Sequence, residues 1–151
     1  MVSPPNAIAH VSGVVEPVNP GGTGAWAFVI RSFDGILLRE GSGRIAAEPV
    51  LTNHVAEYVA LGRALQAYIA LRLPGPLLVR GDSRLLIRQM RGEWQVRRGA
   101  YVRAHRSVAD LLLRCPFEVQ WEWVPQTQNE RVYEMTRAAL AGSASCPVHV
   151  P

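Results

Sequence analysis

The feature that most constrains the fold of this 151-residue chain is a short apolar run that stops at charged residues and is followed by helical spacing. Residues 77–79 are apolar, residues 80–83 read Arg-Gly-Asp-Ser, and the apolar residues of 85–90 repeat like one face of a helix. We predict a buried strand, a tight turn and a helix that starts at Ser83. Working groups of open α/β sheets usually lie where strands end, which is the position of Asp82. Asp is also a common helix N-cap, so a capping role and a functional role both stay open for Asp82.

The rest of the pattern predicts a single α/β domain. The predicted elements are strands at 8–15, 25–31 and 36–42, a short extra strand at 44–47, a helix from 52 or 53 to about 72, the strand and helix around Asp82, a helix over 101–112, a strand at 117–123 and a helix over 129–141. Asp34-Gly35 is a strong hairpin signal. Three early strands, followed by strands that alternate with helices, predict a mixed sheet flanked by helices. We expect a loose N-terminus over 1–6, one domain over 7–141 and an irregular tail over 142–151.

The composition is that of a soluble domain, with 48% hydrophobic and 19% charged residues. No apolar run approaches the roughly 20 residues that a bilayer requires, so no membrane partner is expected. The first ten residues lack the basic flank and apolar core of a secretory signal, and we therefore expect a cytoplasmic location. Cys115 and Cys146 lie far apart without metal-ligand spacing; two thiols are expected, with a disulfide that ties down the tail as the alternative. The oligomeric state cannot be predicted.

All 16 basic residues are arginine, and the formal charge is +4. Arginine binds phosphates through two hydrogen bonds and stacks on bases, which favours a nucleic-acid partner. Ion pairing or genome composition would also produce an arginine excess. Half of the arginines crowd the middle of the chain and predict a local basic surface: Arg80, Arg84, Arg88, Arg91, Arg97, Arg98, Arg103 and Arg106.

Two kinds of side chain leave alternatives open. Glu57 lies at the edge of the apolar stripe of the helix that begins near residue 52, and a partly buried glutamate needs a partner. That partner is either a nearby arginine or a metal ion shared with Asp82. Trp94 either stacks on a nucleic acid or covers the core, whereas Trp121 and Trp123 lie on the predicted inward face of a strand and are expected in the core.

Five motifs in this order resemble type 1 ribonuclease H, most closely its short branch from archaea and many bacteria. They are Asn19-Pro20-Gly21, Asn53-His54-Val55-Ala56-Glu57-Tyr58, Gly81-Asp82-Ser83, Gly92-Glu93-Trp94, and Trp123-Val124-Pro125 with Asn129. The resemblance implies a mixed five-stranded sheet flanked by helices, with three antiparallel strands before the alternating strands and helices. It also implies cleavage of the RNA strand of RNA–DNA hybrids by two magnesium ions that four carboxylates hold.

By this resemblance, two of the four carboxylates are retained and two are replaced. Glu57 is the helix carboxylate and Asp82 the strand-end carboxylate. Ser12 stands where the family has the first-strand aspartate, or Gly13 does if the alignment shifts by one residue, and Tyr133 stands at the last-helix aspartate. A serine hydroxyl is a poor ligand for magnesium, which prefers carboxylate oxygens. Glu57 and Asp82 alone are therefore expected to bind Mg²⁺ or Mn²⁺ weakly or not at all.

Two other acids could substitute for the missing carboxylates, namely Glu16 after the first strand and Glu134 beside Tyr133. The resemblance further implies that Asn19 and Asn53 contact the nucleic acid. Arg84 replaces a residue that is often glutamine in the family. The other candidates for the nucleic-acid surface are Arg88, Arg91, Arg97, Arg98 and Trp94.

Three hypotheses follow. We favour a ribonuclease H-like protein that binds RNA–DNA hybrid or another structured nucleic acid, with a degraded two-metal site and weak or no hydrolysis. The first alternative is an active endonuclease that uses substitute carboxylates. The second is a protein-interaction module that keeps only the fold, because fold does not imply function.

Overall fold

The computed structural model describes residues 3–96, 99 and 101–142. Arg97, Arg98, Cys146 and residues 143–151 of the predicted tail lie outside the described residues, so the disulfide alternative stays open. Among the described helices, none combines the length and the apolar character needed to cross a bilayer.

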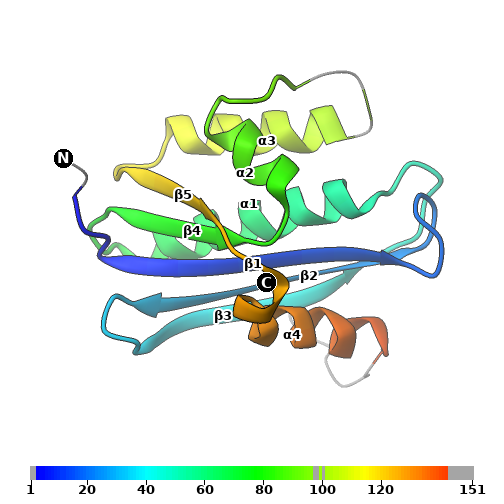
Figure 1. The fold of residues 1–151 in the computed structure, drawn as a ribbon, viewed down its shortest axis with the longest axis horizontal. Coiled ribbons are helices and arrows are strands. Elements are labelled where there is room, and N and C mark those ends of the chain that lie inside the picture. Colours follow the sequence, from blue (N-terminus) through cyan, green and yellow to red (C-terminus); the bar gives the residue numbers. More distant parts are fainter. Residues whose placement is uncertain (1–2, 97–98, 100, 143–151) are drawn as a thin grey trace.

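The chain forms a five-stranded sheet with the strand order β3-β2-β1-β4-β5 (Figure 1). In chain order the elements are β1 (Ala7–Glu16), β2 (Thr23–Ser32), β3 (Leu37–Ile45), α1 (Asn53–Leu71), β4 (Leu77–Gly81), α2 (Arg84–Met90), α3 (Tyr101–Leu113), β5 (Val119–Trp123), the 3-10 turn η1 (Gln126–Gln128) and α4 (Glu130–Leu140). The pairs β1–β2 and β2–β3 are antiparallel, and β1–β4 and β4–β5 are parallel. This arrangement confirms the predicted fold class.

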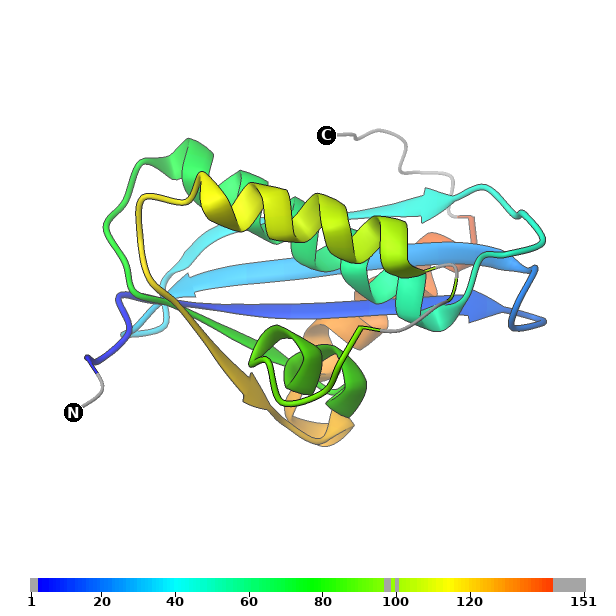
Figure 2. The same ribbon diagram turned by 90° about the horizontal axis from the view of Figure 1, so that it is seen from above.

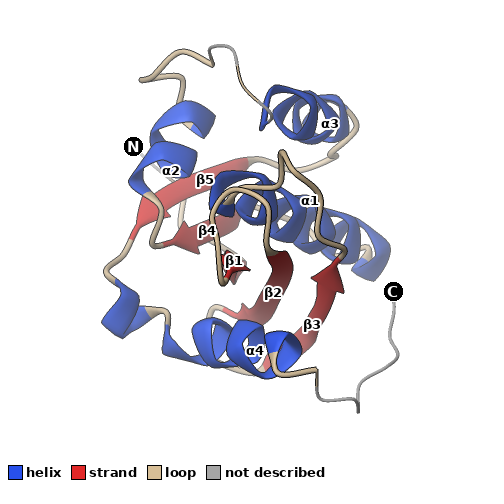
Figure 3. Ribbon diagram, turned by 90° about the vertical axis from the view of Figure 1, so that its right-hand side faces the viewer, coloured by secondary structure: helices blue, strands red, loops and turns tan. Residues whose placement is uncertain are grey.

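Helices cover both faces of the sheet (Figures 2 and 3). Helix α1 begins after Thr52, whose hydroxyl accepts a hydrogen bond from the N–H of Val55. Its apolar stripe packs on the sheet, and its largest fully buried members are Tyr58, Leu61, Leu65 and Tyr68. Burial of each of these leucine side chains contributes about 1.5–3 kcal/mol to stability. Helix α3 packs on α1, and α4 covers the opposite face, where Val132 contacts Ala27 and Val29 of β2.

One local prediction was wrong, and one open alternative is excluded. The extra strand at 44–47 does not form, because β3 runs without a break to Ile45, which pairs with Gly24 of β2, and the chain then leaves the sheet. Asp82 does not cap α2. The cap is Ser83, whose hydroxyl accepts a hydrogen bond from the N–H of Leu86 at 3.2 Å.

The described part of the predicted loose N-terminus makes specific hydrogen bonds. The N–H of Asn6 donates to the carbonyl of Pro76 at 2.8 Å, and its side-chain amide donates to the hydroxyl of Tyr68 at 2.9 Å. The carbonyl of Ser3 accepts a hydrogen bond from Gln120 of β5. These contacts join the entry to β1 to the region around β4 and β5.

Candidate functional site

The register of β1 and β4 and the packing of α1 set where Ser12, Glu57 and Asp82 lie. In the parallel pair β1–β4, Val11 is in register with Gly81, and Ser12 and Asp82 are the residues that follow this pair. Next to Ser12, Gly13 meets the backbone of α1 directly: a Cβ added there would lie 2.3 Å from the carbonyl carbon of Ala56 and 2.4 Å from the nitrogen of Glu57. Only glycine permits this approach. The close approach therefore explains the glycine at position 13, and Ser12 is the residue beside it in β1.

Among the described residues the partner of Glu57 is a histidine, and not the arginine that was one of the two alternatives. Glu57 Oε1 lies 3.2 Å from His54 Nδ1, one helical turn earlier, and the Glu57 side chain is 19% exposed. The other ring nitrogen of His54, Nε2, lies 2.9 Å from Oε1 of Gln89 on α2. That same oxygen accepts a hydrogen bond from the hydroxyl of Tyr58 at 2.7 Å. This network joins α1 to α2.

Asp82 has no comparable charged partner among the described residues. Burial raises the pKa of the Asp82 carboxyl, and a hydrogen bond with its own backbone opposes that shift. The main-chain carbonyl of Asp82 accepts a hydrogen bond from the indole nitrogen of Trp123 at 3.1 Å, which fixes the turn between β4 and α2. A carboxyl with a raised pKa in a partly buried turn is a candidate for a functional group.

Tyr133, which the resemblance assigns to the fourth carboxylate position, lies near an ion pair of Arg137 with Glu16. Tyr133 is half-buried on α4, and the guanidinium of Arg137 lies 5.8 Å from the centre of its ring. Arg137 also binds the carboxylate of Glu16 through both Nη atoms, and this hydrogen bonding holds the pKa of the Glu16 carboxyl below its usual value. Glu134 is exposed. No hydrogen bond or ion pair of the described residues links Glu16 or Glu134 to Glu57 or Asp82.

The donor set does not fit a dinuclear magnesium centre. Ser12 is buried, with 4% exposure, and faces α4, because it lies opposite Ala27, which contacts Val132. Within the described ranges, no three His, Cys, Asp or Glu side chains gather closely enough to hold a metal ion. The carboxylates near the site are Glu57 and Asp82, and Glu57 is engaged with His54.

Asn19 and Asn53 lie together, and their side-chain oxygens have structural partners. Oδ1 of Asn53 accepts a hydrogen bond from the N–H of Val15 at 2.7 Å, and Oδ1 of Asn19 accepts one from the N–H of Asn53 at 3.0 Å. The first loop is thereby fixed to the start of α1. The Nδ2 groups of both asparagines make no hydrogen bond within the described part of the chain and can donate to a ligand.

Two arginine–tryptophan stacks lie at α2. The guanidinium of Arg84 is 3.8 Å from the ring centre of Trp123, and that of Arg88 is 4.9 Å from the ring centre of Trp94. Trp94 is 44% exposed, which excludes the core interpretation. Arg91, in contrast, donates two hydrogen bonds to the carbonyl of Trp121, at 3.1 and 2.7 Å, and is therefore engaged within the protein.

The core prediction for Trp121 and Trp123 was only partly right. Every residue of β5 is half-buried, because β5 is an edge strand with one neighbour. Trp121 packs against the main core, but Trp123 lies beneath Arg84.

Sequence reasoning missed a buried polar link between β1 and α4. Asn129 is 2% exposed, and its amide nitrogen donates to the carbonyl of Val11 at 2.9 Å. Its Oδ1 lies 2.8 Å from Nδ1 of His10, and burial lowers the pKa of that imidazole. The resemblance had singled out Asn129, but nothing in the sequence indicated a contact with a residue 119 positions away.

Comparisons with known proteins identify the family and the fold. The family model described as reverse transcriptase-like matches residues 14–139. A bifunctional protein of Mycobacterium tuberculosis and an uncharacterized protein of Mycobacterium bovis are each 29% identical to this chain over 130 residues, which is 83% of the chain. The chain spans about a third (33%) of the length of these relatives.

Solved structures with the same fold include two at 29% identity. One is a ribonuclease H1 from compost in complex with an RNA/DNA hybrid, with a TM-score of 0.81 over 92% of this chain and 99% of that one. The other is ribonuclease H1 from the archaeon Halobacterium salinarum, with a TM-score of 0.77 over 89% and 97%. The N-terminal ribonuclease H domain from Mycobacterium tuberculosis, at 24% identity, shares the fold with a TM-score of 0.80 over 91% of this chain and 95% of that one.

Proposed function

Because this chain belongs to the reverse transcriptase-like family and is a type 1 ribonuclease H relative, we propose that it binds RNA–DNA hybrid or a duplex of similar shape, with weak or no hydrolysis. The observation that carries the proposal is the loss of negative charge at the carboxylate positions. By the resemblance, Ser12 and Tyr133 occupy two of these positions, and Glu57 and Asp82 occupy the other two. The relative from compost was solved with an RNA/DNA hybrid, which supports the choice of ligand.

Electrostatics argues against efficient two-metal hydrolysis. Two divalent cations about 3.5–4 Å apart repel each other strongly and need several anionic ligands between and around them. A serine hydroxyl supplies no charge at the Ser12 position, and a phenol ring with an arginine beside it supplies none at Tyr133. The proposed site would hold a single hydrated Mg²⁺ or Mn²⁺ weakly through Glu57 and Asp82.

The surface around α2 supports nucleic-acid binding. Arg84 and Arg88 keep their guanidinium groups over tryptophan rings, a geometry that leaves their N–H groups able to reach phosphates. Trp94 offers an exposed ring for contact with sugar or base. Asn19 and Asn53 add amide donors. Recognition through phosphates and 2′-hydroxyls suits an A-form-like duplex and needs no base sequence.

The test is binding of a labelled RNA–DNA hybrid, duplex RNA and duplex DNA at several salt concentrations. We expect hybrid binding that weakens steeply with salt, and an affinity about tenfold or more lower for the double variant Arg84→Ala/Arg88→Ala. The slope of log affinity against log salt should fall by about one for each phosphate that an arginine no longer neutralises. Arg114→Ala, an exposed arginine after α3, is the matched control and should bind like the wild type.

Two outcomes would overturn the proposal. One is the absence of binding to any of the three duplexes at low salt, which would leave the protein-interaction module. The other is equal binding by the double variant and the wild type, which would move the interface away from α2.

A further inference from the structure

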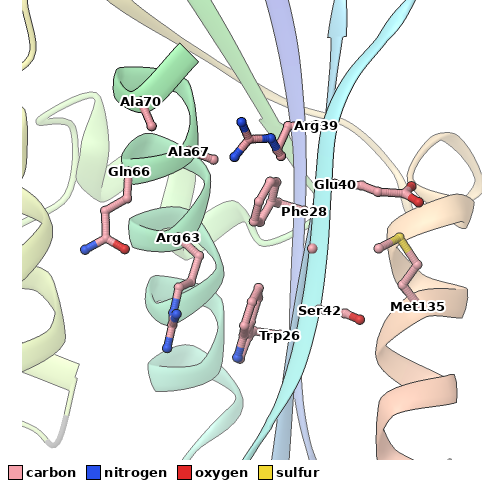
Figure 4. A pocket seen from close by; sticks show the side chains of 11 residues that line it. Trp26, Phe28, Arg39, Glu40, Ser42, Arg63, Gln66, Ala67, Ala70 and Met135 are labelled. Carbon is pink, nitrogen blue, oxygen red and sulfur yellow. The ribbon is translucent and has the colours of Figure 1, made fainter. Parts of the chain in front are cut away.

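A groove of about 680 Å³ runs along the free edge of β3, on the side of the sheet away from β5 (Figure 4). In Figure 4, Arg39 points toward α1, while Glu40 and Ser42 point toward α4, where Met135 completes the lining. The groove therefore extends around the sheet edge and is open to both helical layers. Its volume is within the range of about 300–1,000 Å³ that ligand sites occupy.

The sequence keeps this groove open through small residues. Gly41 lies opposite Phe28, and Gly43 lies opposite Trp26, so the two aromatic rings spread over the backbone of β3. The rings are nearly parallel, with centres 6.1 Å apart and planes 9° apart. On the helix side, Ala67 and Ala70 leave space between α1 and β3. The two rings, at 6% and 5% exposure, form the buried aromatic base of the groove.

The charge of the groove is positive. Arg39 and Arg63 both line it, and neither forms an ion pair with a carboxylate of the described residues. The guanidinium of Arg63 lies 4.9 Å from the ring centre of Trp26. Glu40 is neutralised by Arg131 of α4, with Arg131 Nη2 3.3 Å from Glu40 Oε1. Two cations that have no acidic partner in the described part of the chain are thus held beside an open strand edge.

The edge itself offers backbone hydrogen bonds. Within the described sheet, β3 pairs with β2 along one side, and its other side has no neighbouring strand. Free N–H and C=O groups that alternate along such an edge match another peptide backbone. A nucleic-acid backbone carries no N–H donors and cannot complete this ladder.

We propose that the β3 edge and its groove bind an extended acidic peptide segment of a partner protein. The segment adds a strand beside β3 and directs alternate carboxylates toward Arg39 and Arg63. The arginines also repel basic segments, which gives the edge the selectivity that exposed strands need. This surface lies apart from Asp82 and α2, because β2 and β1 separate β3 from β4 in the sheet.

The test uses a fluorescein-labelled ten-residue peptide of alternating Asp and Val, with binding followed by fluorescence anisotropy. We expect saturable binding that weakens with salt and an affinity at least about tenfold lower for Arg39→Ala/Arg63→Ala. Ala70→Glu, an exposed helix position on the groove, should weaken binding through repulsion without disturbing the core. Arg106→Ala, an exposed arginine of α3, should bind the peptide like the wild type, and thermal melting should verify that each variant is folded.

Two altered probes separate charge from strand pairing. A peptide with Lys in place of Asp should not bind, and a peptide N-methylated at alternate residues should lose most of its affinity. The proposal fails if the Asp-Val peptide shows no binding at about 1 mM, or if it binds the double variant as well as the wild type. It also fails if a single-stranded oligonucleotide binds with the same dependence on Arg39 and Arg63, because the groove would then be a nucleic-acid site.

Discussion

At the scale of single residues, Glu57 and Asp82 are held in different environments. Glu57 has a hydrogen-bond partner in His54, which is itself connected to Gln89. Asp82 is partly buried without a cation among the described residues, and the pKa of its carboxyl is raised as a consequence. The two carboxylates that the family resemblance retains are therefore not equivalent.

Asp82→Asn should stabilise the protein at neutral pH. Burial raises the pKa of the Asp82 carboxyl in the folded protein. Protonated Asp82 therefore contributes to folding stability below the unfolded-state pKa, and this stability is lost as the pH rises through the folded-state pKa. Asparagine has the same shape and no charge, so the variant does not lose stability in this pH range. Thermal denaturation with a chelator should give a higher Tm for the variant at pH 7, and the difference should disappear below about pH 4.

Asp110→Asn, at an exposed position of α3, is the control for this comparison and should leave the Tm nearly unchanged. A lower Tm of Asp82→Asn at pH 7 would mean that the ionised carboxylate of Asp82 is stabilised in the folded protein, contrary to the raised pKa.

At the scale of the elements, the contact between β1 and α1 determines where the candidate site forms. The two backbones meet at Gly13, and Glu57 follows directly in α1. The prediction of α1 itself succeeded, because its apolar stripe and its Thr52 cap are local signals. The prediction of a separate strand at residues 44–47 failed, because a sequence pattern does not show where pairing with the neighbouring strand ends. The prediction that Trp123 lies in the core failed, because the pattern does not show that its strand lies at the edge of the sheet.

Gly13→Ala should destabilise the protein by about 2 kcal/mol or more, because its Cβ would lie 2.3 Å from the backbone of Ala56, which cannot yield like a flexible side chain. Gly62→Ala within α1 is the matched control. A Cβ there would meet only Val108, at 3.7 Å, and alanine in a helix is favoured over glycine by about 0.5–1 kcal/mol. Urea denaturation should show opposite signs for the two variants. Equal stability of Gly13→Ala and the wild type would refute the close approach.

At the scale of the whole molecule, the sheet separates two surfaces. The arginine–tryptophan stacks lie by α2 and β5 at one end of the strand order, and the groove with Arg39 and Arg63 lies along β3 at the other. The two proposed ligands, a nucleic acid and an acidic peptide, would therefore occupy separate surfaces. The candidate carboxylates lie between these surfaces, where β1 and β4 are adjacent.

The sequence predicted part of the candidate site. Motif order predicted that Glu57, Asp82 and Ser12 share a site, and the structure shows the register of β1 with β4 and the contact of Gly13 with α1 on which that prediction depends. It did not predict the contact of His54 with Gln89 or that of Glu16 with Arg137, because these pairs join residues 35 and 121 positions apart. Such contacts depend on how helices pack on the sheet and leave no periodic trace in the sequence.

The proposal of a degraded metal site is tested most directly by cleavage of an end-labelled RNA–DNA hybrid by the wild-type protein and by Asp82→Asn, in Mg²⁺ and in Mn²⁺. Because the proposed site lacks two anionic ligands, we predict that the cleavage rate of the wild type is at most about ten times that of Asp82→Asn in either metal. Rapid cleavage by the wild type that Asp82→Asn abolishes would contradict the proposed function, because it would require a working metal site at Asp82 despite Ser12 and Tyr133.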